Sequence, residues 1–140
     1  MEIYPKLRTY KLAKTSHQFE PYLYITIPKY RSSFSRFRLS SHDLEIERGR
    51  YTRPKTPVEK RTCRFCQNNI VEDEIHFLLT CKKYNSLRSE MFNTVNNFVY
   101  GLSNLDSQTQ FVRLLTSDQE EVLHAVGKYL WKAEQIRKHS

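Results

Sequence analysis

The chain has 140 residues, a mean hydropathy of −0.69 and a formal net charge of +8. No stretch approaches the ~18 consecutive apolar residues of a membrane helix, and the charged N-terminus lacks the apolar core of a signal peptide. We therefore expect a nuclear or cytoplasmic protein with no membrane partner. The length predicts one domain, or one domain with an extended arm.

Positive charge is concentrated in the first half of the chain. Residues 1–64 contain fifteen Lys and Arg against six Asp and Glu, whereas residues 65–140 contain eight against nine. A one-sided basic segment favours binding to a phosphate backbone, and the Arg guanidinium matches phosphate geometry better than Lys does. The alternative is an ordinary solvated surface. The candidate nucleic-acid contacts are Arg31, Arg36, Arg38, Arg48, Arg50, Arg53, Arg61 and Arg64.

Residues 1–30 are expected to form an N-terminal arm without a clear period. At its end, the aromatic and β-branched segment 21–27 favours a strand, with a helical turn after Pro21 as the alternative. A basic helix is predicted from Pro28, because proline suits the first turn of a helix and apolar residues then recur at helical spacing. This apolar stripe comprises Tyr30, Phe34 and Phe37.

Residues 42–47 alternate between apolar and acidic side chains, which predicts a short extended segment. We expect His42 to be packed or on the surface, because no cysteine or carboxylate pair with a defined role lies near it in the sequence. Gly49 ends the alternation, and a loop rich in Pro, Lys and Arg leads to Cys63.

Four side chains of the kinds that bind zinc follow within nineteen residues, in the pattern C-x2-C-x9-H-x4-C. Structural zinc sites hold the ion tetrahedrally with four such ligands. All three cysteines of the chain belong to this pattern, and their odd number argues against a disulfide framework. Three unrelated buried thiols are the alternative, which the clustering disfavours. The predicted ligands of a structural Zn²⁺ are Cys63, Cys66, His76 and Cys81.

The acidic run at 72–74 is expected to cap a short helix that carries His76, rather than to form a catalytic centre. Cys81 lies about one and a half helical turns beyond His76, so we expect this helix to end or distort near Cys81. Apolar periodicity then predicts three helices, over 82–100, 107–116 and 118–138.

Two capping boxes, Ser107-x-x-Gln110 and Ser117-x-x-Glu120, predict where the last two helices begin. Gly127, inside the last helix, is expected to mark a close crossing with another helix. The predicted fold is mainly α: residues 31–140 form a small helical domain around a CCHC zinc module at 62–87. A short extended segment near 42–47 completes it.

Two segments of the chain resemble a known family. The resemblance is carried by RFRLSSHDLEIERGRY and by RTCRFCQNNIVEDEIHFLLTCKKYNSLR, which are similar to the zinc-binding region that follows the reverse transcriptase domain in non-LTR retrotransposons. It covers roughly residues 34–92. It implies a closed structural zinc site at the same four ligands, binding of template RNA or target DNA, and the rest of a reverse transcriptase polypeptide as a partner. The interval between Cys66 and His76 is longer than in the better-known elements.

The leading hypothesis from the sequence is a nucleic-acid-binding module with a structural zinc. The alternatives are a zinc-stabilised protein-interaction domain, which would dock a partner on the apolar stripe of the last helix, and a transposon remnant without a catalytic role. We expect no enzymatic activity. A fourth protein ligand closes the metal to water, although Glu74 would be the candidate general base, and the chain lacks the Tyr/Phe-x-Asp-Asp sequence of a polymerase.

Overall fold

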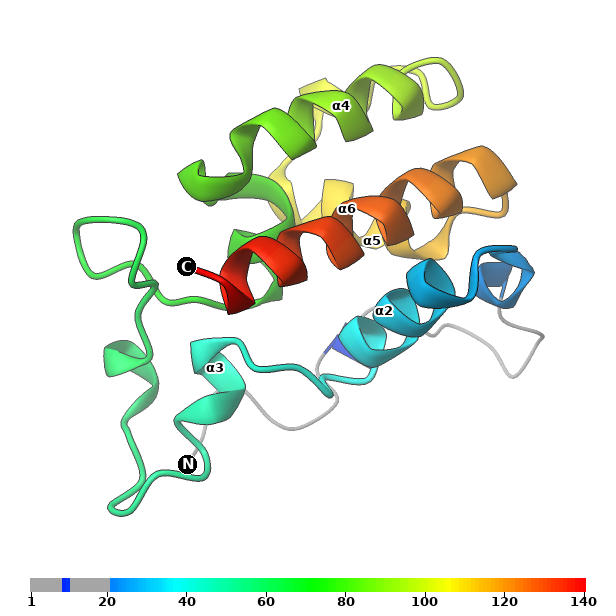
Figure 1. Cartoon of the computed structure of the whole chain (residues 1–140). Coiled ribbons are helices and arrows are strands. Elements are labelled where there is room, and N and C mark those ends of the chain that lie inside the picture. Colours follow the sequence, from blue (N-terminus) through cyan, green and yellow to red (C-terminus); the bar gives the residue numbers. More distant parts are fainter. Residues whose placement is uncertain (1–8, 11–20) are drawn as a thin grey trace.

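Helix α6 (Glu120–Lys138) is the element on which the other long helices pack. The computed structural model describes residues 9–10 and 21–140. In Figure 1, α6 runs between α4 and α2, with α5 behind it. The other helices are α2 (Pro28–Arg38), α3 (Glu45–Arg48), α4 (Asn85–Val95) and α5 (Ser107–Thr116). Short 3-10 or π turns occupy η1 (Pro21–Tyr24), η2 (Val58–Lys60), η3 (His76–Thr80), η4 (Lys82–Tyr84) and η5 (Leu102–Asn104).

The mainly helical prediction is confirmed. Within residues 9–10 and 21–140 the fold has no named strand, and the one β contact is an isolated antiparallel bridge between Thr62 and Val71. In the same part of the chain, every helix is too short or too polar to cross a membrane.

The crossing of α2 and α6 is close because of Gly127. A Cβ built on Gly127 would lie 3.0 Å from the carbonyl oxygen of Tyr30 and 3.2 Å from its Cβ. Any side chain at this position would push the two backbones apart, so the predicted close crossing is confirmed. The predicted stripe of α2 faces the core, since Tyr30, Phe34 and Phe37 are all buried.

The apolar face of α6 lies inside the core. The buried residues of this face include Val122, Val126, Tyr129, Leu130 and Ala133, whereas Ile136, near the end of the helix, is exposed. A protein-interaction domain that docks its partner on this stripe would need these residues at the surface. The structure contradicts that version of the alternative, because α2, α4 and α5 already cover the face.

The helix starts differ from the capping-box predictions. Helix α5 spans the predicted residues, but its cap is Asp106, whose Oδ2 accepts a hydrogen bond from the Thr109 amide at 3.2 Å. Helix α6 begins at Glu120 because Ser117 Oγ accepts from the Gln119 amide, two residues on, which forms a turn before the helix rather than a capping box.

The helix predicted over 82–100 is divided. A 3-10 turn, η4, precedes α4, and α4 ends at Val95. The chain then turns as far as Gly101, whose φ of 74° places it in the left-handed region.

The structure corrects two extended segments. The possible strand at 21–27 begins instead with the 3-10 turn η1, as the alternative anticipated. In the segment near 42–47, Leu44 is extended, but α3 starts at Glu45. The reason is long-range: the Glu72 carboxylate accepts from the Glu45 amide at 2.8 Å, and the Glu72 carbonyl accepts from the Ile46 amide. These bonds satisfy amides at the start of a helical turn. The predicted arm at 1–30 lies largely outside the described residues.

Candidate metal centre

A short hairpin presents the first two predicted ligands. It is closed by the Thr62–Val71 bridge, and the Cys63 amide donates to the Ile70 carbonyl at 2.8 Å. Asn68 and Asn69 reverse the chain with φ angles of 72° and 54°. Asn adopts this left-handed conformation more readily than most residues. The hairpin therefore brings Cys63 and Cys66 toward the following helix.

The π turn η3 presents the other two ligands. The Cys81 amide donates to the His76 carbonyl at 2.8 Å, an i to i+5 hydrogen bond that is one residue longer than in an α-helix. The extra residue returns Cys81 to the side of the turn that carries His76. The predicted distortion near Cys81 is confirmed, and its physical form is this wider turn.

The four predicted ligands come together. Their ligand atoms all lie within 4.8 Å of one another. Cys81 Sγ is 3.8 Å from both Cys63 Sγ and Cys66 Sγ, and Cys66 Sγ is 3.6 Å from His76 Nε2. Thiolates bound to one tetrahedral zinc at ~2.3 Å would lie about 3.8 Å apart, and an imidazole nitrogen would lie slightly closer to them. The donor set and its spacing therefore fit a tetrahedral Zn²⁺.

The orientation of the His76 ring is set by Thr80. His76 Nδ1 lies 2.9 Å from Thr80 Oγ1, which in turn donates to the His76 carbonyl at 3.3 Å. Because the hydroxyl proton goes to the carbonyl, Nδ1–H is the donor in the first contact and Nε2 keeps its lone pair. Partners of this kind fix the ring of metal-binding histidines and strengthen them as ligands.

Burial makes the site unfavourable for charge in the absence of a cation. It raises the pKa of the Cys81 thiol to about 12 and also raises the pKa of Cys63. It lowers the pKa of His76, which favours the neutral imidazole. Without a cation, the raised pKa values favour the protonated thiols. A bound divalent cation would instead favour the thiolates, because it stabilises their negative charge directly.

Two buried side chains hold the backbone of η3 in place. Tyr129 of α6 donates its hydroxyl hydrogen to the Phe77 carbonyl at 2.6 Å. Arg88 of α4 donates through Nε to the Leu78 carbonyl at 3.0 Å and through Nη2 to Tyr129 Oη at 3.0 Å. Helices α4 and α6 thus fix the π turn from outside the ligand set.

The acidic run at 72–74 divides into three roles. Asp73 is the predicted cap, since its Oδ1 accepts from the His76 amide at 2.8 Å. Glu72, 1% exposed, forms a bidentate ion pair with Arg137 at 2.7 and 3.0 Å, and so joins the metal centre to the end of α6. Glu74 is also buried and pairs with His42 Nε2. His42 is therefore packed, one of the two outcomes expected.

The eight predicted arginines fall into three groups. Arg38 and Arg61 are 2% and 1% exposed, which removes both from any contact surface; Arg61 instead donates to the carbonyls of Ile46 and Thr56. Two more are half-buried and bonded within the chain: Arg31 to the Ile25 carbonyl and Arg50 to Glu47. The remaining four are exposed: Arg36, Arg48, Arg53 and Arg64. Of these, Arg36 pairs with Glu134 at 3.1 Å, and Arg64 donates through Nη2 to the Arg137 carbonyl at 2.7 Å.

Sequence reasoning missed the residues that support the ligands. Thr80 could have been found, because it is four residues from His76 and threonine often bonds within a turn. Arg88, Tyr129 and Arg137 carry no local signal, since their partners lie 10 to 65 residues away.

No protein-family model, curated protein or solved structure matches this chain.

Proposed function

We propose that this protein is a nucleic-acid-binding module in which a structural zinc holds the hairpin and the π turn together. The resemblance to the region that follows the reverse transcriptase domain of non-LTR retrotransposons supports RNA or DNA as the partner, and the remainder of such a polypeptide as a second one. The observation that carries the proposal is a pair of cations that flank an aromatic ring beside the metal ligands.

That ring belongs to Phe65, between the first two ligands. The Arg64 guanidinium lies 4.8 Å from its centroid, and Lys83 Nζ lies 5.0 Å from it. The ring also meets Tyr84 edge to face, with centroids 6.4 Å apart. Phe65 thus packs beside the metal ligands, and the exposed cations of Arg64 and Lys83 lie over its ring. There they would contact successive phosphates of one strand.

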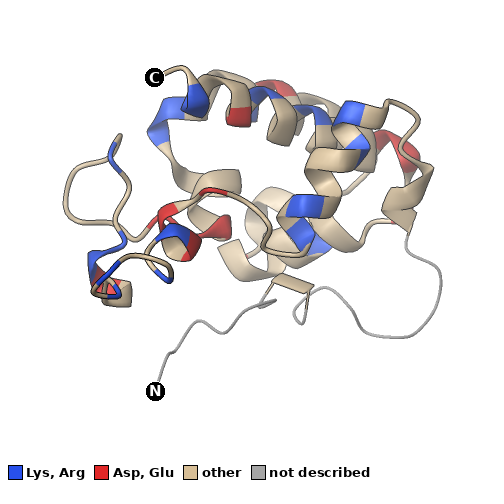
Figure 2. Ribbon diagram, turned by 60° about the horizontal axis from the view of Figure 1, so that its bottom comes forward, with Lys and Arg blue, Asp and Glu red and all other residues tan. Residues whose placement is uncertain are grey.

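More exposed cations continue this surface. Figure 2 shows Lys and Arg along the loop between α3 and the metal centre. Positive charge in a loop beside a rigid zinc module supports sequence-independent contact with a phosphate backbone. The exposed residues of this loop include Arg53, Lys55 and Lys60, and Lys82 is exposed next to Lys83.

A binding role rather than catalysis is supported by the same geometry. Four protein ligands saturate a tetrahedral zinc and leave no position for an activated water. Glu74, the carboxylate closest in sequence to the histidine ligand, is 3% exposed and bonded to His42 and Ser40. A general base must reach the proton that it removes, and Glu74 is enclosed by partners.

The test is fluorescence anisotropy of zinc-loaded protein with labelled single- and double-stranded RNA and DNA over a salt series. The double variant Arg64→Gln/Lys83→Gln should weaken binding about tenfold and reduce the slope of log K against log salt by about 2 for duplex DNA, close to one per lost phosphate contact. The matched control, Arg113→Gln/Lys128→Gln, removes two charges from α5 and α6 and should retain the slope. No binding at low salt by metal-loaded protein would refute the proposal.

A further inference from the structure

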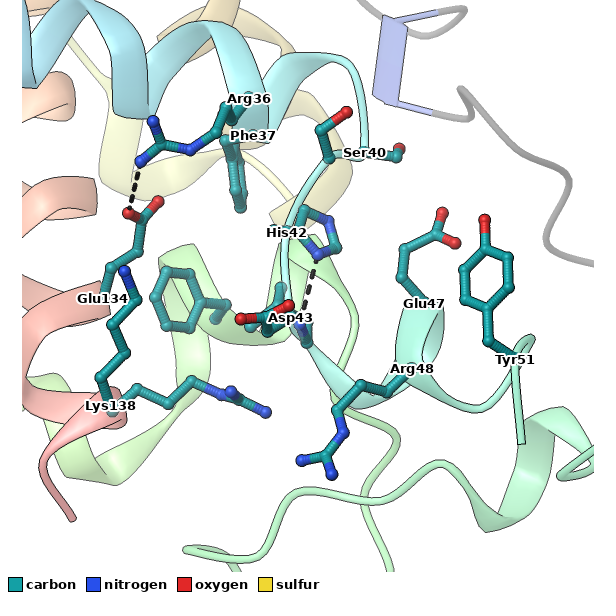
Figure 3. Close-up of a pocket in the computed structure, with 14 residues that line it drawn as sticks. Arg36, Phe37, Ser40, His42, Asp43, Glu47, Arg48, Tyr51, Glu134 and Lys138 are labelled. Atoms are coloured by element: carbon teal, nitrogen blue, oxygen red, sulfur yellow. Dashed lines mark hydrogen bonds and ion pairs between the residues drawn. The ribbon is translucent and has the colours of Figure 1, made fainter. Parts of the chain in front are cut away.

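A pocket of about 530 Å³ opens on the side of the molecule where α2 ends and α6 ends. Its walls come from the last turn of α2, the segment that leads into α3, and the last turn of α6 (Figure 3). The volume lies within the range of pockets that hold small organic ligands. The metal ligands are not among its lining residues.

The floor of this pocket is apolar. Phe37, Leu44 and Phe77 line it and are each 1–3% exposed, so their contact surface is fixed by the core. Tyr51 stands at its edge with 69% of its surface exposed. A ligand would touch little of the floor, because its residues are already covered, whereas a flat ring could stack on the exposed tyrosine.

Most charged groups around the pocket are already satisfied by partners in the fold. Arg36 pairs with Glu134 at 3.1 Å, and Arg137 pairs with Glu72 at 2.7 Å. The groups left for a ligand are Asp43, Arg48 and Lys138. Arg48 is 59% exposed and makes only a 3.5 Å contact with Glu45. Among the described residues, the exposed side chains of Asp43 and Lys138 have no hydrogen-bond or ion-pair partner.

These three groups suit the two ends of a nucleotide. Two cations on the rim match a phosphate. A carboxylate accepts hydrogen bonds and donates none, so it prefers a base edge that carries two adjacent N–H donors. Guanine has such an edge, at N1–H and N2–H₂. Single-stranded nucleic acid presents unstacked bases whose pairing edges are free to bind in this way.

We propose that this pocket binds one unpaired guanine nucleotide of a bound strand. The base stacks on Tyr51 with its pairing edge toward Asp43, and the phosphate lies between Arg48 and Lys138. The inference rests on the proposed function, because it places a single nucleotide of the same strand that the cations beside Phe65 contact. It adds a preference for a base, which a phosphate-binding surface does not supply.

The experiment is a titration of zinc-loaded, isotope-labelled protein with GMP, followed by NMR shifts of the pocket amides and by calorimetry. AMP, guanosine and inorganic phosphate are the comparison ligands. We expect saturable GMP binding centred on residues 42–51, with AMP, guanosine and phosphate each at least tenfold weaker. Asp43→Asn should remove the preference for GMP over AMP. Arg48→Gln/Lys138→Gln should weaken both nucleotides about tenfold and leave guanosine unchanged.

The control is Arg113→Gln, an exposed cation on α5, which should bind GMP as the wild type does. Zinc content and circular dichroism establish that each variant is folded. If oligonucleotides bind but GMP does not shift the pocket amides, the pocket assignment is overturned and the proposed function stands. If GMP binds as described but oligonucleotides do not bind, the proposed function is overturned, and with it the assignment of the pocket to a nucleotide of a bound strand. Equal binding of GMP and AMP by the wild type overturns the assignment of the pocket to guanine.

Discussion

The helical core and the metal centre are built from different kinds of buried residue. Where α2 meets α6, the contact is apolar and close: Phe34 and Val126 are fully buried, and Gly127 lets the backbones approach. Around the metal ligands, the buried residues include charged side chains with specific partners, namely Arg61, Glu72, Arg88 and Arg137.

This difference indicates how each region is stabilised. Apolar burial is non-directional and is divided among many contacts. The hairpin at 62–71 has one β bridge and exposed residues at its tip, so it cannot depend on a core of its own. We expect its order to depend on a metal bound by the four candidate ligands and on the buried ion pair between Glu72 and Arg137, which fails as a unit when one partner is lost. The comparison can be tested by disrupting each region separately.

Removal of the metal should have the largest effect. Structural zinc contributes about 10–16 kcal/mol of apparent binding free energy in small zinc peptides, so a chelator, or Cys81→Ser, should abolish metal binding and disorder residues 62–84. Metal analysis, thermal melting and amide NMR measure this. Zinc added back should restore the wild type but not the variant. A melting temperature unchanged by chelation would show that the metal centre is not structural.

Loss of the buried ion pair between Glu72 and Arg137 should come next. Glu72→Gln removes the bidentate partner of the buried Arg137 guanidinium and leaves it only the more distant Glu45, at 3.6 Å. Breaking a buried ion pair in this way typically costs about 3–5 kcal/mol. Urea denaturation measures it. The control is Glu90→Gln, which breaks the exposed pair between Lys128 and Glu90 at 3.0 Å and should change stability by less than about 1 kcal/mol. Equal effects of the two substitutions would remove the distinction between the regions.

An enlarged side chain at the helix crossing should disturb the core alone. In Gly127→Val, the added atoms meet the Tyr30 backbone, and overpacking of this kind costs about 1–3 kcal/mol. The variant should bind one zinc per chain as tightly as the wild type, measured by competition with a chromophoric chelator. Weakened zinc affinity would instead couple the two regions.

The smallest effect should follow the loss of the Thr80 hydroxyl. Thr80→Val removes the partner of His76 Nδ1 and should weaken zinc affinity about tenfold, the lower end of what such partners contribute. Thr116→Val is the matched control, because Thr116 Oγ1 also bonds a carbonyl four residues back, at 2.7 Å. If both variants bind zinc alike, Thr80 does not orient the ring.

The same contrast explains what the sequence could predict. The four ligands lie within nineteen residues, so their spacing alone indicated that they meet, and the structure confirms it; zinc itself stays a prediction. Helix α5 and the crossing at Gly127 also follow from local pattern. The burial of Arg38 and Arg61 could not be predicted, because nothing in the neighbouring sequence distinguishes them from exposed arginines. Arg61 is buried against the Ile46 carbonyl, and Arg38 against the Tyr22 ring, so their burial depends on other segments. The start of α3 at Glu45 likewise depends on a distant residue, Glu72.

The π turn at His76–Thr80 also affects how sites of this kind are searched for. An α turn brings residues four apart to one side, and a π turn does the same for residues five apart. One ligand geometry can therefore be encoded as H-x3-C on an α turn or as H-x4-C on a π turn. A search pattern that fixes this interval at a single value would detect one of the two encodings and pass over the other, although the ligand atoms occupy the same positions.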